Sequence, residues 1–114
     1  MRTMTRRTLP VLAATALVSS GAPHAQHIHI GGANQCPDPD QVGTGFEGAL
    51  RTTDAIDSYG AVQVSLTTEG DTSPASALAV DRYPVGDATY SRTFAVTDEV
   101  AASLRNGEGS VVLH

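Results

Sequence analysis

The histidines of this chain gather at two places. His24, His27 and His29 fall within six positions, and the fourth histidine, His114, follows the apolar run 111–113. Alternate side chains of a β-strand point to the same face, so His27 and His29 would share one face. Two imidazoles about 7 Å apart can converge on one metal ion, and imidazole is the commonest transition-metal ligand. The spacing therefore indicates either a metal-binding pair or a half-buried strand with histidine on its exposed face.

An export signal is expected over residues 1–22. Three arginines precede the apolar run 9–18, and small residues at 19–22 offer a cleavage site. Two of the arginines, Arg6 and Arg7, are adjacent, and the segment around them also resembles a twin-arginine signal. The apolar run is too short for a permanent membrane-spanning helix. We therefore expect a secreted or extracytoplasmic protein with no transmembrane span after cleavage.

One small domain, residues 23–114, is expected to follow the signal. It contains four arginines and no lysine against twelve acidic residues, a net charge of −8. Nucleic acids and anionic membranes are bound through basic surfaces, so this balance argues against both as partners. A domain of this size buries only about 60–65% of its unfolded surface, so its core should be small.

Alternating apolar and polar residues predict a series of strands after the histidine strand. These strands cover residues 46–50, 61–67, 77–83, 88–96 and 110–114. In the strand 61–67, the even positions are apolar and the odd positions polar, which predicts one buried and one solvent-facing side. The last strand would leave an unpaired edge, through which the chain could form a homo-oligomer.

Two helical segments are predicted between the strands. A short helical turn capped by Thr52 or Thr53 should end near 59–60. A longer helix should begin after Thr97, present an apolar face, and end at Asn106-Gly107. The prolines and glycines of segment 31–45 predict a loop.

Four other features in the sequence receive a structural interpretation. Asp38 and Asp40 fit a solvated turn better than a cation site. The glycines of 43–48 match a nucleotide-binding pattern, but without the strand and helix around it they indicate a loop. The polar residues 81–83 fit a strand-end salt bridge. Cys36 is the only cysteine, so it would be a free thiol, pair with another chain, or have its partner in sequence not present here.

Several of these segments together resemble the CHRD (chordin-type) domain of secreted bacterial and archaeal proteins. The resemblance covers about residues 22–114. Its most specific parts are the His-Ile-His-Ile-Gly-Gly strand and the closing helix–glycine–strand–histidine unit, which ends Val-Val-Leu-His. Between them lie VSLTTEGDTS at 64–73, AVDRYP at 79–84 and Thr-Phe-x-Val at 93–96. The family is associated with an antiparallel β-sandwich, has no established general catalytic activity, and includes animal relatives that bind growth factors.

The resemblance implies a mainly β fold. It would be an antiparallel, Greek-key-like β-sandwich, complete or incomplete, with one short helix near the C-terminus. Members normally have strand-forming sequence before the His-x-His segment and continue past the closing histidine, often with more cysteine. The resemblance therefore implies a truncated or internally deleted domain, with the partner of Cys36 in the missing part.

The same strand skeleton is similar to that of copper/zinc superoxide dismutase. This second resemblance implies that His27, His29 and His114 are copper-type ligands. The metal-bridging histidine, the zinc loop and the active-site arginine have no match in this sequence, so a full dismutase site is not expected.

Three classes of function follow. The first is an exported, non-catalytic β-sandwich module that binds an unknown protein or surface partner and coordinates copper or zinc through His27, His29 and His114. The second is a redox enzyme of superoxide dismutase type. The third is a structural or surface-interaction domain whose histidines only pack or face water. Metal affinity separates the first two from the third.

Overall fold

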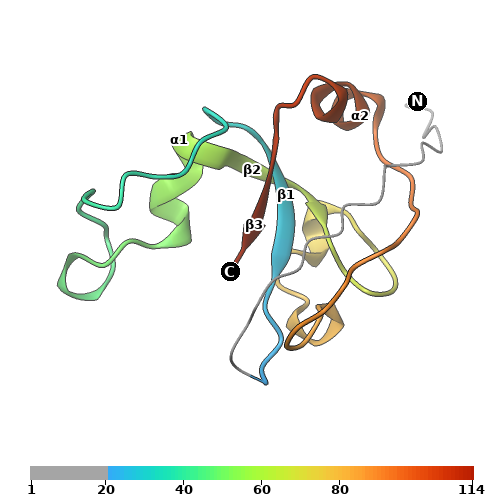
Figure 1. The fold of residues 1–114 in the computed structure, drawn as a ribbon, viewed down its shortest axis with the longest axis horizontal. Coiled ribbons are helices and arrows are strands. Elements are labelled where there is room, and N and C mark those ends of the chain that lie inside the picture. The colour runs from blue at the N-terminus through green and yellow to red at the C-terminus, as the bar shows by residue number, and fades with distance from the viewer. Residues whose placement is uncertain (1–20) are drawn as a thin grey trace.

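The computed structural model describes residues 21–114, so nearly all of the predicted export signal lies outside the described residues. A three-stranded antiparallel sheet forms the centre of the fold (Figure 1). Its strands are β1 (Gln26–Gly31), β2 (Gly60–Ser65) and β3 (Gly109–Leu113), arranged in the order β2-β1-β3. The mainly β character is confirmed at this level, with two short α-helices added. Within residues 21–114, no helix has the length and apolar character needed to cross a membrane.

The alternation predicted for the histidine strand is confirmed. Ile28 is 5% exposed and belongs to the apolar core, and Ile30 packs against that core. The histidines between and beside them lie on the opposite face because successive strand residues alternate. β1 is the middle strand, so both of its edges are paired and its two faces are covered by different parts of the chain.

The apolar face of the sheet is covered by helix α2 (Asp98–Arg105). As predicted, Thr97 caps this helix, its hydroxyl oxygen accepting a hydrogen bond from the Val100 amide at 3.3 Å. Val100 and Ala101 pack on the sheet and complete the core. The buried members of this core are Ile28, Val64, Leu66, Val96, Val100 and Ala101.

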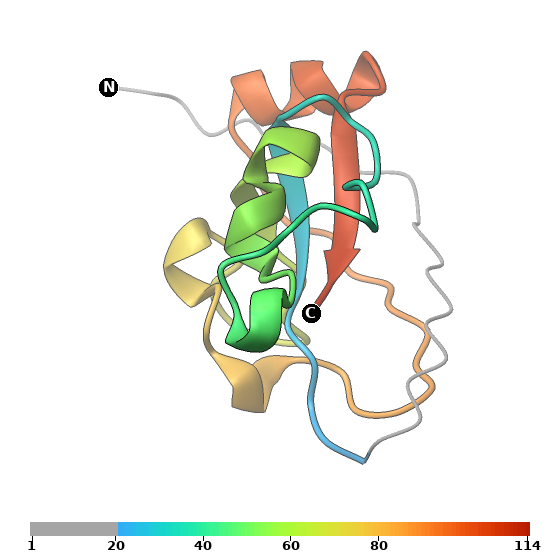
Figure 2. The same ribbon diagram turned by 90° about the vertical axis from the view of Figure 1, so that its left-hand side faces the viewer.

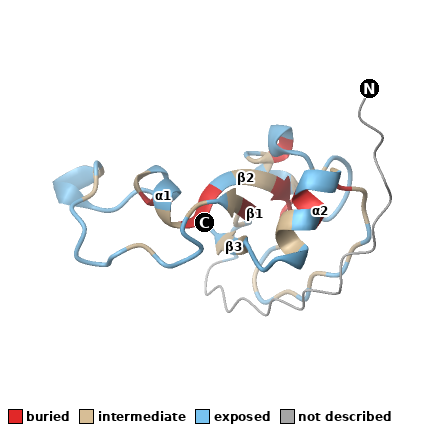
Figure 3. Cartoon of the chain, turned by 90° about the horizontal axis from the view of Figure 1, so that it is seen from above, coloured by how far each residue is buried: buried red, intermediate tan, exposed pale blue. Residues whose placement is uncertain are grey.

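The histidine face of the sheet is covered by a second helical segment. A 3-10 turn, Thr52–Ala55, continues into α1 (Ile56–Tyr59), which ends at Gly60 as predicted. The predicted threonine cap is wrong: the N-cap position is Arg51, whose amide donates to the Asp54 carboxylate at 2.8 Å. Seen from above, α1 and α2 lie on opposite sides of the sheet (Figure 3). A view along another axis shows the turns of this segment passing in front of β1 (Figure 2). The sheet is thus enclosed by one helical segment on each face.

The strand predicted at 46–50 is wrong. The chain forms a single 3-10 turn there, Phe46–Gly48, with Phe46 84% exposed. Backbone hydrogen bonds of the surrounding glycines close this loop. The amide of Gly43 donates to the carbonyl of Gly48, and the amide of Gly45 donates to the carbonyl of Ala49. The loop interpretation of segment 43–48 therefore agrees with the structure.

The strands predicted at 77–83 and 88–96 are also wrong. The first region contains a 3-10 turn, Val80–Arg82. Another 3-10 turn, Pro74–Ser76, lies directly before this region and starts with a proline that fits the first helical position. The second region forms no strand with the other described residues, and apart from a β-bridge at Ala88 it has no regular secondary structure. The side chains of Tyr90 and Arg92 hold it instead, both donating to the carbonyl oxygen of Thr67 at 3.0 and 2.9 Å. Alternate side chains of this segment still face the core, which explains the strand-like pattern.

The solvent-facing side predicted for 61–67 is wrong as well. Ser65 and Thr67 are fully buried, because the loop after β2 folds back over them. The Ser65 hydroxyl donates to the carbonyl of Ser73 at 2.8 Å, and the Thr67 hydroxyl donates to that of Asp71 at 2.8 Å. Small hydroxyl side chains are tolerated here because each finds a backbone acceptor.

Candidate metal centre

All three predicted ligand residues meet on the histidine face of the sheet. One ring nitrogen from each of His27, His29 and His114 lies within 4.8 Å of the other two. The ring centroids are separated by 4.8 Å for the pair 27–114, by 5.5 Å for 27–29 and by 5.6 Å for 29–114. His27 and His29 are each 4% exposed. The cluster therefore consists of two buried imidazoles, His27 and His29, and the half-buried imidazole of His114.

Strand pairing brings the distant histidine to the other two. Val112 of β3 lies opposite His27, and Ser110 lies opposite His29. The amide of His114 continues the ladder by donating to the carbonyl of Ala25 at 2.8 Å. Residues opposite each other in a ladder share a face, so this register places His114 on the face of His27 and His29.

The fourth histidine is not part of the cluster. The Nδ1 atom of His24 lies 2.8 Å from the carbonyl oxygen of His114, outside the set of converging nitrogens. His24 therefore contacts the backbone of a cluster residue but contributes no ring nitrogen to the cluster.

A glycine carbonyl orients His29. The Nδ1 atom of His29 lies 2.7 Å from the carbonyl oxygen of Gly60, which can only accept, so Nδ1 carries the proton. Gly60 has φ +88°, and a Cβ atom there would collide with the backbone of Ile30, so only glycine fits. The glycine that ends α1 thus sets the direction of this imidazole, whose Nε2 is left unprotonated.

His27 is oriented by residues of segment 77–83, which was predicted to be a strand. Its Nε2 atom lies 2.9 Å from the carbonyl oxygen of Ala77 and 3.1 Å from the hydroxyl of Tyr83. Because the carbonyl can only accept, Nε2 carries the proton and Nδ1 is free. Sequence reasoning placed Tyr83 in a strand-end salt bridge. The structure instead buries it against His27, and the neighbouring Arg82 reaches the hydroxyl of Ser76 at 2.8 Å.

Each histidine of the cluster has one buried ring nitrogen without a hydrogen-bond partner. These atoms are Nδ1 of His27, Nε2 of His29 and Nε2 of His114. Leaving a buried polar atom unsatisfied costs about 1–3 kcal/mol, and native proteins rarely contain such atoms. Three of them lie close enough together, among the described residues, to hold one ion.

Burial favours the neutral forms of two histidines of the cluster, His27 and His114. Desolvation lowers the pKa of the His27 imidazole, with His29 adding a smaller repulsion. Desolvation, followed by repulsion from His27 and His29, lowers the pKa of His114 to about 4. Protonation of these imidazoles is therefore disfavoured at neutral pH, and their lone pairs remain available.

The donor set suits a borderline transition metal. Three neutral imidazoles are typical ligands of zinc and copper, with the fourth position left to water or another ligand. In a tetrahedral zinc site with bonds of about 2.0–2.1 Å, ligand nitrogens lie about 3.4 Å apart. The three nitrogens lie within 4.8 Å of one another, so they would have to approach each other by up to about 1.4 Å to bind one ion. The hydrogen bonds to Gly60 and Ala77 supply the outer contacts that ligating histidines usually make.

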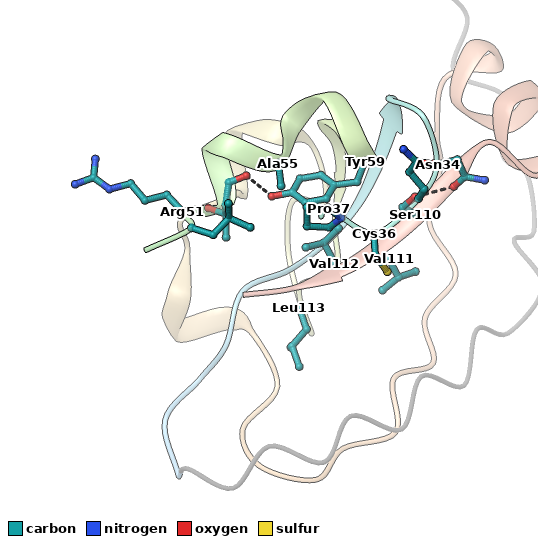
Figure 4. Close-up of a pocket in the computed structure, with 13 residues that line it drawn as sticks. Asn34, Cys36, Pro37, Arg51, Ala55, Tyr59, Ser110, Val111, Val112 and Leu113 are labelled. Atoms are coloured by element: carbon teal, nitrogen blue, oxygen red, sulfur yellow. Dashed lines mark hydrogen bonds between the residues drawn. The ribbon is translucent and has the colours of Figure 1, made fainter. Parts of the chain in front are cut away.

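An open pocket of about 450 Å³ is lined in part by Tyr59, a neighbour of His29 (Figure 4). It is formed by β3, the loop 34–37 and the segment 50–52, with Tyr59 and Ala55 at its back. The ring of Tyr59 meets His29 edge-on at a centroid distance of 4.6 Å, so this tyrosine separates the pocket from the histidines. Cys36, whose thiol is free and exposed, lies at the rim.

The other predicted ligand candidates remain solvated. Asp38 accepts a hydrogen bond from the Asp40 amide at 2.9 Å, and both residues are exposed in their loop. Among residues 21–114, the cluster of His27, His29 and His114 is the one group of three potential ligands close enough to hold an ion.

In comparisons with known proteins, the chain matches no family model, no curated protein and no solved structure.

Proposed function

We propose that this chain is an exported, CHRD-like β-sandwich binding module that coordinates a copper- or zinc-class ion through His27, His29 and His114. The three-stranded sheet would be one part of that sandwich. The ion would stabilise the sheet from its histidine face, and the module itself would carry out no reaction.

The observation that carries the proposal is the set of three unpartnered ring nitrogens. A core that only needed packing would be more stable with apolar side chains here, because these cost no desolvation of polar atoms. A bound ion would accept all three lone pairs at once. The tautomers of His27 and His29 support this arrangement, since the nitrogen bonded to a backbone carbonyl is in each case the one turned away from the cluster.

The experiment is a calorimetric titration of the purified chain with Zn(II) and Cu(II). We expect one-to-one binding with a sub-micromolar Kd that weakens as pH falls toward the lowered pKa values of His27 and His114, the latter about 4, because protonated imidazoles cannot bind metal. Replacing one of three ligands should weaken binding by at least about 100-fold, so His29→Ala should lose tight binding.

His24→Ala is the matched control, because it removes a histidine of the same segment that lies outside the cluster. It should bind metal as the unaltered chain does. Equal losses in His24→Ala and His29→Ala would contradict the assignment of ligands. No binding by the unaltered chain would leave the histidines as packing residues and overturn the proposal.

A dismutase-like activity is a weaker candidate. A cycling copper centre of that type has a second metal site joined by a bridging histidine. In the described part of the chain, the remaining histidine contacts the backbone of His114 instead. A superoxide assay on the copper-loaded chain should therefore show no activity above that of free copper.

A further inference from the structure

Two buried tyrosines flank the histidine cluster in nearly the same way. Tyr83 meets His27 edge-on, with ring centroids 5.7 Å apart and an interplanar angle of 81°. Tyr59 meets His29 edge-on, at 4.6 Å and 73°. The two tyrosines are 3% and 7% exposed. Their rings therefore make comparable packing contacts with the site.

Their hydroxyl groups differ. The hydroxyl of Tyr59 points away from the cluster and donates to the carbonyl of Thr52. The hydroxyl of Tyr83 lies 3.1 Å from Nε2 of His27 and also 2.8 Å from the carbonyl of Ser76. Only Tyr83 can act on a cluster histidine through its oxygen.

The direction of the bonds around Tyr83 follows from its single proton. The nearer carbonyl, that of Ser76, takes this proton, so the phenol oxygen can only accept from His27. Nε2 of His27 must then be the protonated nitrogen. The carbonyl of Ala77, which also accepts from Nε2 at 2.9 Å, enforces the same tautomer.

The acceptor of the Tyr83 proton is itself fixed. The side chain of Ser76 donates to the carboxylate of Asp71 at 2.6 Å and accepts from Arg82 at 2.8 Å. Ser73 donates to the same carboxylate at 2.7 Å. The turn Pro74–Ser76 is thereby held in place, and the orientation of the Tyr83 hydroxyl with it.

We propose that Tyr83 is a positioning residue of the metal centre. Its hydroxyl holds the His27 ring in the Nε2–H tautomer and in the orientation that presents Nδ1 to the ion. The metal-binding part of this inference rests on the proposed function, whereas the tautomer and its hydrogen bond are properties of the metal-free chain.

The test compares Tyr83→Phe with Tyr59→Phe. Both variants keep the ring and remove one buried hydroxyl, so they share the loss of packing and of a backbone hydrogen bond. Loss of an outer-shell partner typically weakens metal affinity about 10–100-fold. We expect a loss of about tenfold for Zn(II) in Tyr83→Phe and a change below about twofold in Tyr59→Phe.

Nitrogen NMR of the metal-free chain gives a second readout, which a purely structural role would not change. In the unaltered chain, His27 should show a protonated Nε2 that exchanges slowly with water and an unprotonated Nδ1. Tyr83→Phe should shift the Nε2 resonance and speed up its proton exchange, and Tyr59→Phe should leave both unchanged. If Tyr83→Phe does not fold, a proton on Nδ1 of His27 in the unaltered chain still overturns the inference, because Nε2 could then donate neither to Tyr83 nor to Ala77.

Two results would overturn the inference. One is a proton on Nδ1 of His27 in the metal-free chain. The other is an equal loss of zinc affinity in the two tyrosine variants, which would reduce Tyr83 to a packing residue. Absence of metal binding in the unaltered chain would overturn the proposed function, and the NMR result would then decide the role of Tyr83 alone.

Discussion

The two faces of strand β1 obey different physical rules. On one face, Ile28 packs into a core of apolar side chains completed by helix α2, and every contact it needs comes from the chain. On the other face, His27 and His29 are buried just as deeply, but each has a ring nitrogen without a partner. One strand thus joins an apolar face to a face with ring nitrogens that have no partner among the described residues.

The apolar face of β1 therefore serves stability, whereas its histidine face carries the candidate site. Apolar burial is non-directional and lowers the free energy of the folded chain without further partners. The histidine face carries the desolvation cost of three imidazoles, and a bound ion would offset it. Substitutions on the two faces should therefore have opposite consequences for folding and for metal binding.

The largest effect is expected from Ile28→Ala. Truncation of a buried isoleucine typically costs about 2–5 kcal/mol, which is a large share of the stability of a domain this small. Urea unfolding of the metal-free chain should show this loss, whereas His29→Ala should change the free energy of unfolding much less, since it also removes an unsatisfied nitrogen. A larger loss in His29→Ala than in Ile28→Ala would break the distinction between the two faces.

A smaller effect is expected from pH. The pKa of His114 is lowered from 6.5 to about 4 in the folded chain, so the unfolded chain binds more protons between these values. The stability contributed by the neutral imidazole is fully present above pH 6.5 and is lost as pH falls toward 4. The pKa of His27 is lowered in the same direction.

The pH effect can be isolated with one variant. Urea unfolding of the metal-free chain at pH 7, 5.5 and 4.5 should show falling stability, with a weaker dependence in His114→Gln. Asp54 and Asp71 do not interfere in this range. Hydrogen bonds from Thr44 and from Ser76, respectively, lower the pKa values of these carboxyls below 3.8, so they contribute at more acidic pH. An unchanged pH dependence in His114→Gln would contradict the assignment.

The smallest effect is expected from Thr97→Ala. This change removes the hydroxyl that caps α2 and should cost about 1 kcal/mol of stability. The helix covers the apolar face, so zinc affinity should stay within about twofold of that of the unaltered chain. Thermal unfolding and zinc titration of the same preparation check both parts. A marked loss of zinc affinity would mean that the two faces are coupled.

Sequence patterns located the elements whose signals are local. The alternation of β1, the Thr97 cap and the glycine that ends α1 all depend on neighbouring residues, and the structure contains each of them. The pattern at 88–96 was equally regular, but it does not reveal whether an edge is available for pairing. There, side-chain hydrogen bonds such as that of Tyr90 to the carbonyl of Thr67 hold the segment in place of strand pairing.

The site was predictable only in part, because sequence patterns report neighbouring residues and do not report which distant segments pair. The spacing of His27 and His29 indicates a shared face, but their proximity to His114 depends on the register between the first and last strands. The prediction that His114 is a metal ligand rested on the family resemblance alone. Tyr83 was missed because its contact with His27 joins positions 56 apart, through turns that resembled a strand.

The pairing of β1 with β3 has a consequence for how the site comes into being. Two ligands lie near the start of the described chain, and the third lies about 85 positions later. An ion bound to all three would link these distant points as a covalent bridge does, and closing a loop of this length removes roughly 4–5 kcal/mol of conformational freedom from the unfolded chain. The centre also cannot exist on a nascent polypeptide until position 114 has been synthesised. Acquisition of the ion by all three histidines would thus come only after His114 has been added, and a chain cut anywhere between the two strands would hold its metal only while its pieces stayed together.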